Sequence, residues 1–463
     1  MTRVNCPARL IILPFALALV ACGHEITTEP PPPPPPPSPP PLPDVPAHQL
    51  AWLNAAVVPI ATADPFATDN ADLESLRAMI GNAHVVALGE ATHGTREFFR
   101  MKDRILRFLV REMGFNAFAI EASWPEANRL DDYVRTGVGA PDTLLSGLYF
   151  WTWNTQEVSD LIQGLRTYNA GVGAGQIGFY GFDMQYPAMA LLNVRRFVQR
   201  VDSAADPEFA GWLECMATYG NDSRGFFPTG TYRSAAPAYR DACHDNLAQA
   251  YATLEQRRDA YETASSPAEF ARALHSARVA IQYEEIASGR STRDVAMAEN
   301  ALWLLHELGP GKKIVLWAHN FHVSTRAGAM GSVLRDSLGN DLVIVGFSFA
   351  NGSFNAVQQS GSRLFGLRAL VAAPPQAWSY EHYFSATARP RFLLDLRNRT
   401  ASGDSAAWLA GPRRFRAIGA VYDPENDDVF SYQAHLPLEF DIVSYFATSA
   451  PSLLLPYRPP QSF

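Results

Sequence analysis

The sequence predicts an α/β fold, with a mainly parallel central sheet flanked by helices and a helical subdomain inserted between strands. Three observations predict it. From about residue 48 onward, short apolar runs alternate with stretches of helical periodicity. The apolar runs are continuous, as is typical of parallel strands buried on both faces. Between about residues 187 and 309 the strand pattern disappears and only helical periodicity remains.

The first part of the domain is expected to contain strands at residues 84–89, 117–121 and 176–183, each a short apolar run. A helix is expected at residues 95–113, because apolar residues from Phe98 to Leu109 recur at helical spacing. Gly114 can end that helix. Strand, helix and strand in this order indicate a parallel sheet covered by helices.

The inserted subdomain is expected to hold helices at residues 191–201, 246–258, 268–288 and 294–308. The segment at residues 291–294 (STRD) is typical of a capping box that opens the last of these helices. Strands are expected next at residues 313–318 and 342–349, with weaker candidates at residues 391–396, 417–421 and 440–446.

Residues 1–22 are typical of a lipoprotein signal peptide. Arg3 and Arg9 form a positively charged region before an apolar stretch at residues 10–20. This stretch is too short to cross a bilayer as a mature helix. The stretch ends in residues 19–22 (LVAC), which resemble a bacterial lipobox. We therefore expect an exported lipoprotein of the bacterial cell envelope, anchored in a membrane through lipidated Cys22. An ordinary cleaved signal with a chance cysteine is the alternative.

A linker is expected at residues 23–47, because proline dominates residues 30–46. Proline runs form extended polyproline II and cannot bury a core. Such a spacer would hold a catalytic domain at residues 48–463 away from the membrane. A tail without a role would have the same local conformation.

The composition points away from nucleic acid as a partner. The formal net charge is −8, and no run of lysine and arginine is longer than a dipeptide. Two cysteines, Cys215 and Cys243, remain in the body of the chain once Cys6 and Cys22 are assigned to the signal and the anchor. We expect them to form a disulfide between two helices of the insertion, as suits an oxidising compartment.

Titratable residues follow the ends of the predicted buried strands. Glu90 and His93 follow the first strand, Glu121 ends the second, and Asp183 ends the third. His319 and His322 follow the strand after the insertion. In open α/β sheets the functional crevice lies at the carboxyl ends of the strands, so these groups are expected to meet at one edge. Any one of them alone would more often be a capping or core residue than a catalytic one, and it is their joint occurrence that predicts a site.

A resemblance to the erythromycin esterase family is carried by the strings VALGEATHGTREFFRMKDRILRFLV, FAIEASWPEANRLDDYVRTG, RDVAMAEN and VLWAHNFHV. It covers about residues 75–350 and fades toward the C-terminus. The resemblance implies that the family's functional residues fall on Glu90, His93, Glu121, His319 and His322. It further implies a hydrolase, which in some members opens a macrolide lactone ester and so confers antibiotic resistance.

These residue types suit ester hydrolysis. Histidine is the natural general base for water at neutral pH, and we assign this role to His93. Glu90 or Glu121 would orient its ring, as the acid does in a catalytic triad. His319 and His322 would donate to the oxyanion and to the leaving oxygen, in an order that the sequence leaves open. A covalent route is disfavoured, because the chain has no GxSxG motif.

A divalent metal is the competing mechanism, because two glutamates, an aspartate and up to three histidines form a plausible ligand set. We favour catalysis without a cofactor, since HExxH and related zinc motifs are missing. Arg293, Trp124 and Trp153 are the candidate substrate-binding residues around a small-molecule ester. The alternatives are a hydrolase of another ester or amide, such as an envelope component, and a surface-anchored binding protein without catalysis.

Overall fold

The computed structural model describes residues 41–173, 175–220, 230–397 and 403–457. The expected signal peptide, Cys22 and most of the expected linker lie outside these residues. The described residues from Leu42 onward form one compact unit. Within the described residues, no helix combines the length and the apolar character needed to cross a membrane.

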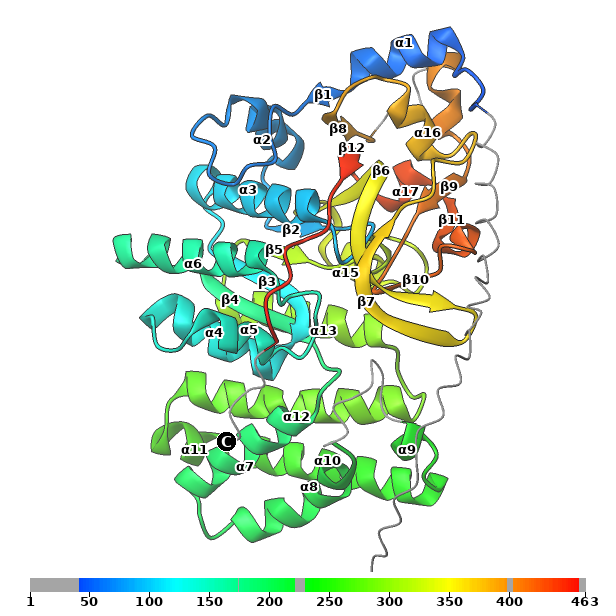
Figure 1. Ribbon diagram of the computed structural model, residues 1–463. Helices are drawn as coiled ribbons and strands as arrows, with labels where there is room; N and C mark the ends of the chain where they lie inside the picture. The colour runs from blue at the N-terminus through cyan, green and yellow to red at the C-terminus, as the bar shows by residue number, and fades with distance from the viewer. Residues whose placement is uncertain (1–40, 174, 221–229, 398–402, 458–463) are drawn as a thin grey trace, which may run out of the picture. The chain divides into compact units, whose positions relative to one another are not determined.

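A large sheet forms the centre of this unit (Figure 1), with its main strands in the order β1-β8-β12-β6-β2-β5-β3-β4. From β12 to β4 all neighbouring strands are parallel, whereas β8 is antiparallel to β1 and β12. The mainly parallel sheet predicted from the sequence is therefore confirmed. The strands are β1 (Val58–Pro59), β2 (Val85–Leu88), β3 (Ala117–Ser123), β4 (Gly178–Asp183), β5 (Ile314–Trp317), β6 (Leu342–Ser360), β8 (Arg391–Asp395) and β12 (Ile442–Ser449).

Successive side chains of a strand point to opposite faces of the sheet, so strands that are apolar throughout give the sheet two apolar faces. Helices cover both of these faces. In β2, Val85 and Ala87 belong to one hydrophobic core, while Val86 and Leu88 belong to the other. The second core is covered by α2 (Glu74–Ile80), α3 (Arg96–Met113), α4 (Trp124–Thr136), α5 (Pro141–Ser146) and α6 (Gln156–Gly171). The first is covered by α1 (Ala47–Ala56), α13 (Arg293–Leu308), α14 (Asn320–Val323), α15 (Met330–Leu338), α16 (Tyr380–Ser385) and α17 (Leu436–Glu439).

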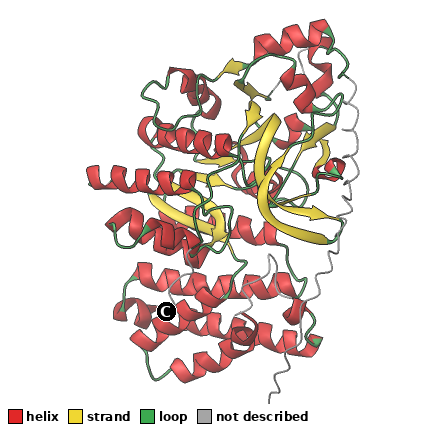
Figure 2. Cartoon of the chain, viewed as in Figure 1, coloured by secondary structure: helices red, strands yellow, loops and turns green. Residues whose placement is uncertain are grey.

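The helical subdomain follows β4, as expected, and contains no strand among its described residues (Figure 2). Its helices are α7 (Ala188–Val201), α8 (Asp206–Gly220), α9 (Gly230–Arg233), α10 (Pro237–Gln256), α11 (Arg258–Ala264) and α12 (Pro267–Ala287). The predicted disulfide is confirmed: Cys215 of α8 and Cys243 of α10 are joined, with their Cα atoms 5.6 Å apart.

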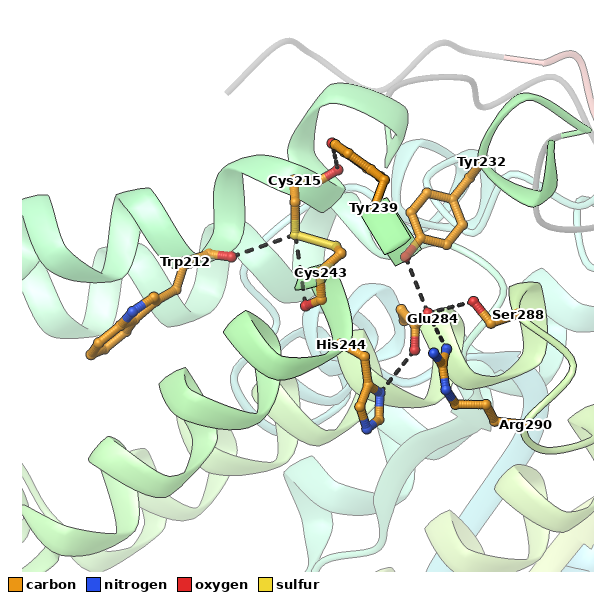
Figure 3. Close-up of a disulfide and its surroundings, with 9 residues drawn as sticks. All are labelled: Trp212, Cys215, Tyr232, Tyr239, Cys243, His244, Glu284, Ser288 and Arg290. Atoms are coloured by element: carbon orange, nitrogen blue, oxygen red, sulfur yellow. Dashed lines mark hydrogen bonds and ion pairs between the residues drawn. A yellow bond between two sulfur atoms is a disulfide. The ribbon is translucent and has the colours of Figure 1, made fainter. Parts of the chain in front are cut away.

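A buried carboxylate lies beside this disulfide (Figure 3). Glu284 of α12 accepts hydrogen bonds from the Tyr232 hydroxyl at 3.1 Å and from Arg290 Nη1 at 2.7 Å. His244 of α10 contacts it through Nδ1 at 2.9 Å. A buried charge needs such partners, so this cluster connects α9 and α10 to the end of α12.

Two features of the C-terminal part differ from the sequence prediction. The strand expected at residues 342–349 continues to Ser360 and turns back as β7 (Arg363–Val371). The strand expected at residues 417–421 is mostly irregular: only β10 (Val421–Tyr422) pairs in the sheet, because residues 417–420 bend toward the cavity described below. A separate pair, β9 (Arg413–Arg416) and β11 (Ser431–Ala434), lies next to it. Single 3-10 turns occur at η1 (Ala71–Leu73), η2 (Gly339–Asp341), η4 (Asp404–Leu409) and η5 (Asp427–Phe430).

Candidate active site

The predicted site residues meet at the carboxyl ends of β2, β5, β3 and β4, which are neighbours in the sheet. All the predicted catalytic residues except the fully buried Glu90 face a cavity of about 530 Å³. Its lining includes the polar side chains of His93, Glu121, Gln185, Arg293, His319 and His322 and the aromatic rings of Phe150, Trp153, Phe321 and Phe430. The volume lies within the range of small-molecule sites, about 300–1,000 Å³.

Glu90 and His93 form a close pair in the turn between β2 and α3. Glu90 Oε1 lies 2.6 Å from His93 Nδ1. Gly94 follows this pair, and the backbone of β6 approaches it so closely that a Cβ atom there would lie 2.0 Å from the carbonyl oxygen of Asn355. Ionised Glu90 can only accept, so Nδ1 carries the hydrogen and Nε2 keeps its lone pair. His93 lines the cavity, and Nε2 has no hydrogen-bond partner among the described residues.

Glu90 is fully buried, and Lys102 of α3 balances its charge. Glu90 Oε2 accepts from Lys102 Nζ at 2.6 Å and from Trp317 Nε1 at 2.7 Å. Burial would raise the pKa of Glu90, but the charge of Lys102 and the contact with His93 outweigh it and hold the pKa below its usual range. Burial also lowers the pKa of Lys102 to about 8, against the attraction of Glu90.

Arg293, the first residue of α13, connects the other acidic groups of the site. Its Nε donates to Asp183 Oδ1 at 3.1 Å, and its Nη2 donates to Asp183 Oδ2 at 2.7 Å and to Glu121 Oε1 at 2.6 Å. Nη1 lies 3.1 Å from His322 Nε2. Burial would lower the pKa of Arg293, but Asp183 and Glu121 together raise it above its usual value. Four of the five N–H groups are thus used within the described residues, and one on Nη1 remains.

Glu121 stays charged although it is buried. Burial raises the pKa of a carboxyl, but His322 and Arg293, followed by His93, lower the pKa of Glu121 well below its usual range. Its second oxygen, Oε2, accepts from the backbone N–H of His319 at 2.9 Å. Glu121 therefore joins the start of α14 to the arginine.

His319 and His322 are both engaged by the protein. His319 Nδ1 accepts from the Phe321 N–H at 3.2 Å, so the hydrogen lies on Nε2, which donates to the Ile418 carbonyl at 3.2 Å. Burial, with His93 and His322 nearby, lowers the pKa of His319 to about 3. His322 Nε2 accepts from Arg293, which leaves Nδ1 to donate to Asp294 Oδ1 at 2.8 Å.

The predicted substrate-binding residues are placed differently. Arg293 and Trp153 line the cavity, and Trp153 Nε1 donates to the Glu121 carbonyl at 3.1 Å. Trp124 is not part of the lining. Its ring packs 4.6 Å from that of His275 and 5.5 Å from that of Trp303, measured between ring centroids. The role predicted for Trp124 is therefore corrected to core packing.

Sequence reasoning missed Lys102, Asp294 and Trp317 as partners of the site. Lys102 lies on the apolar face of α3, between Met101 and Ile105, where a charged residue is unexpected. That position is the signal that could have identified it, because lysine is almost never fully buried without a partner. Nothing in the sequence singles out Trp317, whose indole N–H reaches Glu90 from the neighbouring strand.

The arrangement is also informative about a metal ion. Among the described residues, no group of three or more histidine, cysteine, aspartate and glutamate side chains is arranged to hold one. The guanidinium of Arg293 lies within hydrogen-bond distance of Glu121, Asp183 and His322. The residues present thus fit a site built around a protein cation.

A buried Glu–His pair at the carboxyl edge of a parallel sheet, beside an arginine in a cavity, is an arrangement that can supply general-base catalysis in an α/β enzyme. The family model for erythromycin esterase matches residues 110–449. The chain belongs to the erythromycin esterase family. The match includes Glu121, Arg293, His319 and His322, begins after Glu90 and His93, and extends beyond the resemblance carried by the motifs.

Individual relatives agree with this assignment. Erythromycin esterase type II of Escherichia coli is 24% identical over 328 residues, which cover 64% of this chain and 76% of that protein. A crystal structure of a Bacillus cereus protein is similar with a TM-score of 0.77 and 27% identity, covering 89% of this chain and 100% of that one. A mutant of the erythromycin esterase EreC in its open conformation shares the fold, with a TM-score of 0.65 and 16% identity over 87% of this chain and 99% of that one.

Proposed function

We propose that this hydrolase cleaves carboxylic esters, a macrolide lactone or a similar ester, with water activated by His93. The observation that carries the proposal is the Glu90–His93 pair, 2.6 Å apart, whose remaining ring nitrogen belongs to the lining of the cavity. The name of the Escherichia coli relative, erythromycin esterase type II, supports the choice of substrate class, as does the aromatic part of the lining. Antibiotic resistance would be its consequence.

The steps of the proposed reaction follow from the hydrogen bonds. His93 Nε2 takes a proton from water, and the water oxygen attacks the ester carbonyl carbon. Glu90 holds the Nδ1 hydrogen and stabilises the imidazolium, as the acid does in a triad. The remaining Nη1 hydrogen of Arg293 donates to the oxyanion. The C–O bond to the alcohol then breaks, and His93 returns the proton to the leaving oxygen.

His322 and His319 act in this proposal as positioning residues. His322 connects Asp294 to Arg293, and His319 connects the Glu121 carboxylate to the Ile418 carbonyl. The reaction needs no cofactor in this scheme, because Arg293 supplies the positive charge.

Replacement of His93 tests the function. In the purified protein, His93→Ala should lower kcat for a macrolide or a simple ester by about 10²–10⁴-fold, the usual contribution of a general base. His306→Ala, at a histidine that is 86% exposed, is the control and should keep parental kinetics. Circular dichroism verifies that both variants fold. Unchanged turnover by His93→Ala would contradict the assignment.

Removal of metal ions by a chelator tests separately whether the reaction needs no cofactor. Activity on the same ester should persist after dialysis against EDTA, and metal analysis of active protein should find less than one equivalent. Loss of activity on chelation that added zinc or manganese restores would replace the scheme with a metal-dependent one.

A further inference from the structure

A second cavity lies close to the catalytic one, between α7, α8 and the loop after α5. Its volume is about 350 Å³. Apolar side chains such as Met189, Leu192, Ala210 and Leu213 make up most of the lining, and the charged side chains of Arg195 and Glu214 also belong to it. Neither the reaction nor the positioning of Arg293 uses these residues.

Three aromatic rings form the wall between the two cavities. Tyr149 and Phe150 are consecutive, yet Tyr149 lines the second cavity and Phe150 lines the first. The ring of Tyr186 lies 4.9 Å from that of Tyr149 and 5.3 Å from that of Phe150, measured between centroids. On the other chain segment, Gln185 lines the first cavity and Ala188 the second. Neighbouring residues on both segments thus line the two cavities.

The backbone of this wall is strained at one position. Tyr149 has a φ of 65°, in the left-handed region that residues other than glycine rarely adopt. Such strain persists only when surrounding contacts fix the residue, and it is concentrated at ligand-binding sites. Here it directs consecutive side chains into different cavities.

We propose that the second cavity binds an apolar arm of the ester whose carbonyl group lies at His93. This inference rests on the proposed function and narrows it: the substrates are amphipathic esters with a long apolar substituent. The first cavity holds the polar reacting part, which His93, Arg293 and Glu121 face. The apolar side chains of the second cavity remove the arm from water, and the arm reaches them past the side chains of Tyr149, Phe150 and Tyr186.

The test compares p-nitrophenyl decanoate with p-nitrophenyl acetate, which differ only in the length of the acyl arm. Ala210→Trp fills the second cavity from α8, and the ratio of kcat/KM for decanoate to that for acetate should fall by roughly tenfold or more. Ala217, further along α8, lines the same cavity, so Ala217→Trp should have the same effect on this ratio. Gly211→Trp is the matched control, because a side chain there meets open space, and its ratio should equal that of the parent.

Binding of the free decanoate ion, measured by calorimetry with the parent and these variants, separates this inference from the proposed function. If the parent hydrolyses neither ester, the function proposal fails for simple esters, while loss of decanoate binding in Ala210→Trp but not in Gly211→Trp still supports the apolar subsite. If the ratio and the binding are unchanged in folded Ala210→Trp and Ala217→Trp, the second cavity does not hold the substrate.

Discussion

Glu90 is a carboxylate without access to water, and one lysine balances its charge. Lys102 Nζ lies 2.6 Å from Glu90 Oε2 and 4.3 Å from the centroid of the Trp317 ring. A buried charge without a partner is costly. If Lys102 lost its proton, Glu90 would keep the Trp317 N–H but no charged partner in direct contact, and the carboxylate would hold the imidazole of His93 in its protonated form. A protonated His93 cannot take a proton from water.

This dependence predicts the alkaline side of the pH profile. The pKa of Lys102 is lowered to about 8 by burial, so kcat/KM should decline above that pH, by roughly tenfold per pH unit for a single ionisation. Lys102→Arg keeps the charge at higher pH and should move the decline upward, because a guanidinium stays protonated. Lys312→Arg, at an exposed lysine, is the control. An unshifted alkaline limb in active Lys102→Arg would show that another group causes the decline.

The site residues that could be predicted from the sequence are those that end buried strands. Glu90, Glu121 and His319 follow apolar runs, and the parallel sheet then places them together. Their hydrogen-bond partners could not be predicted, because they depend on rotamers and on distant segments. Ile418, for example, lies 99 residues beyond His319 and accepts its Nε2 hydrogen. For that reason the sequence left the roles of His319 and His322 open.

At the level of elements, the prediction succeeded where burial is uniform. β2, β3 and β5 are buried along their whole lengths, and their apolar runs were recognised. β7 is exposed over most of its length, although it contains leucine, phenylalanine and valine, so its sequence gives neither an alternating nor a buried pattern. Residues 417–420 have strand-like composition but bend to line the cavity, a tertiary effect that composition does not encode.

The disulfide gives a prediction for the helical subdomain. It closes a loop with a sequence separation of 28 residues between α8 and α10. In the chain-entropy model such a loop is worth about 3–4 kcal/mol. Replacing both Cys215 and Cys243 by serine should lower the free energy of unfolding by up to that amount, as measured by urea denaturation without reductant. Equal urea midpoints for the parent and the double variant would show that the crosslink adds no stability.

At the scale of the whole molecule, we propose that the domain is exported and anchored in a membrane through Cys22, with residues 1–21 removed. The lipobox-like end of the apolar segment and the proline-rich stretch after it support the proposal. In a bacterial host, Cys22→Ala should leave the membrane fraction or remain unprocessed. Cys6→Ala, inside the segment to be removed, is the control. A Cys22→Ala protein that fractionates and migrates like the parent would contradict the anchor.

His275 lies where the helical subdomain meets the sheet domain. It belongs to α12, its ring stacks on Trp303 of α13 with centroids 3.5 Å apart, and it contacts Trp124 of α4 edge-on. Its Nε2 is buried without a hydrogen-bond partner in the described part of the chain. Burial, with Arg278 nearby, lowers the pKa of His275 to about 3. The ring is therefore neutral in the folded protein.

This histidine makes the stability of the whole molecule sensitive to acid. Unfolded, it would have a pKa near 6.5. Between about pH 6.5 and the lowered folded value, the unfolded state binds a proton that the folded state does not, so stability falls as the pH falls. For one such group the loss between pH 6.5 and pH 5 is at most about 2 kcal/mol. His275→Phe keeps the ring packing and should lose less stability than the parent between pH 7 and pH 5 in urea titrations. His306→Gln, at the exposed histidine, should lose as much as the parent, and an equal loss in all three proteins would mean that His275 does not couple folding to protons.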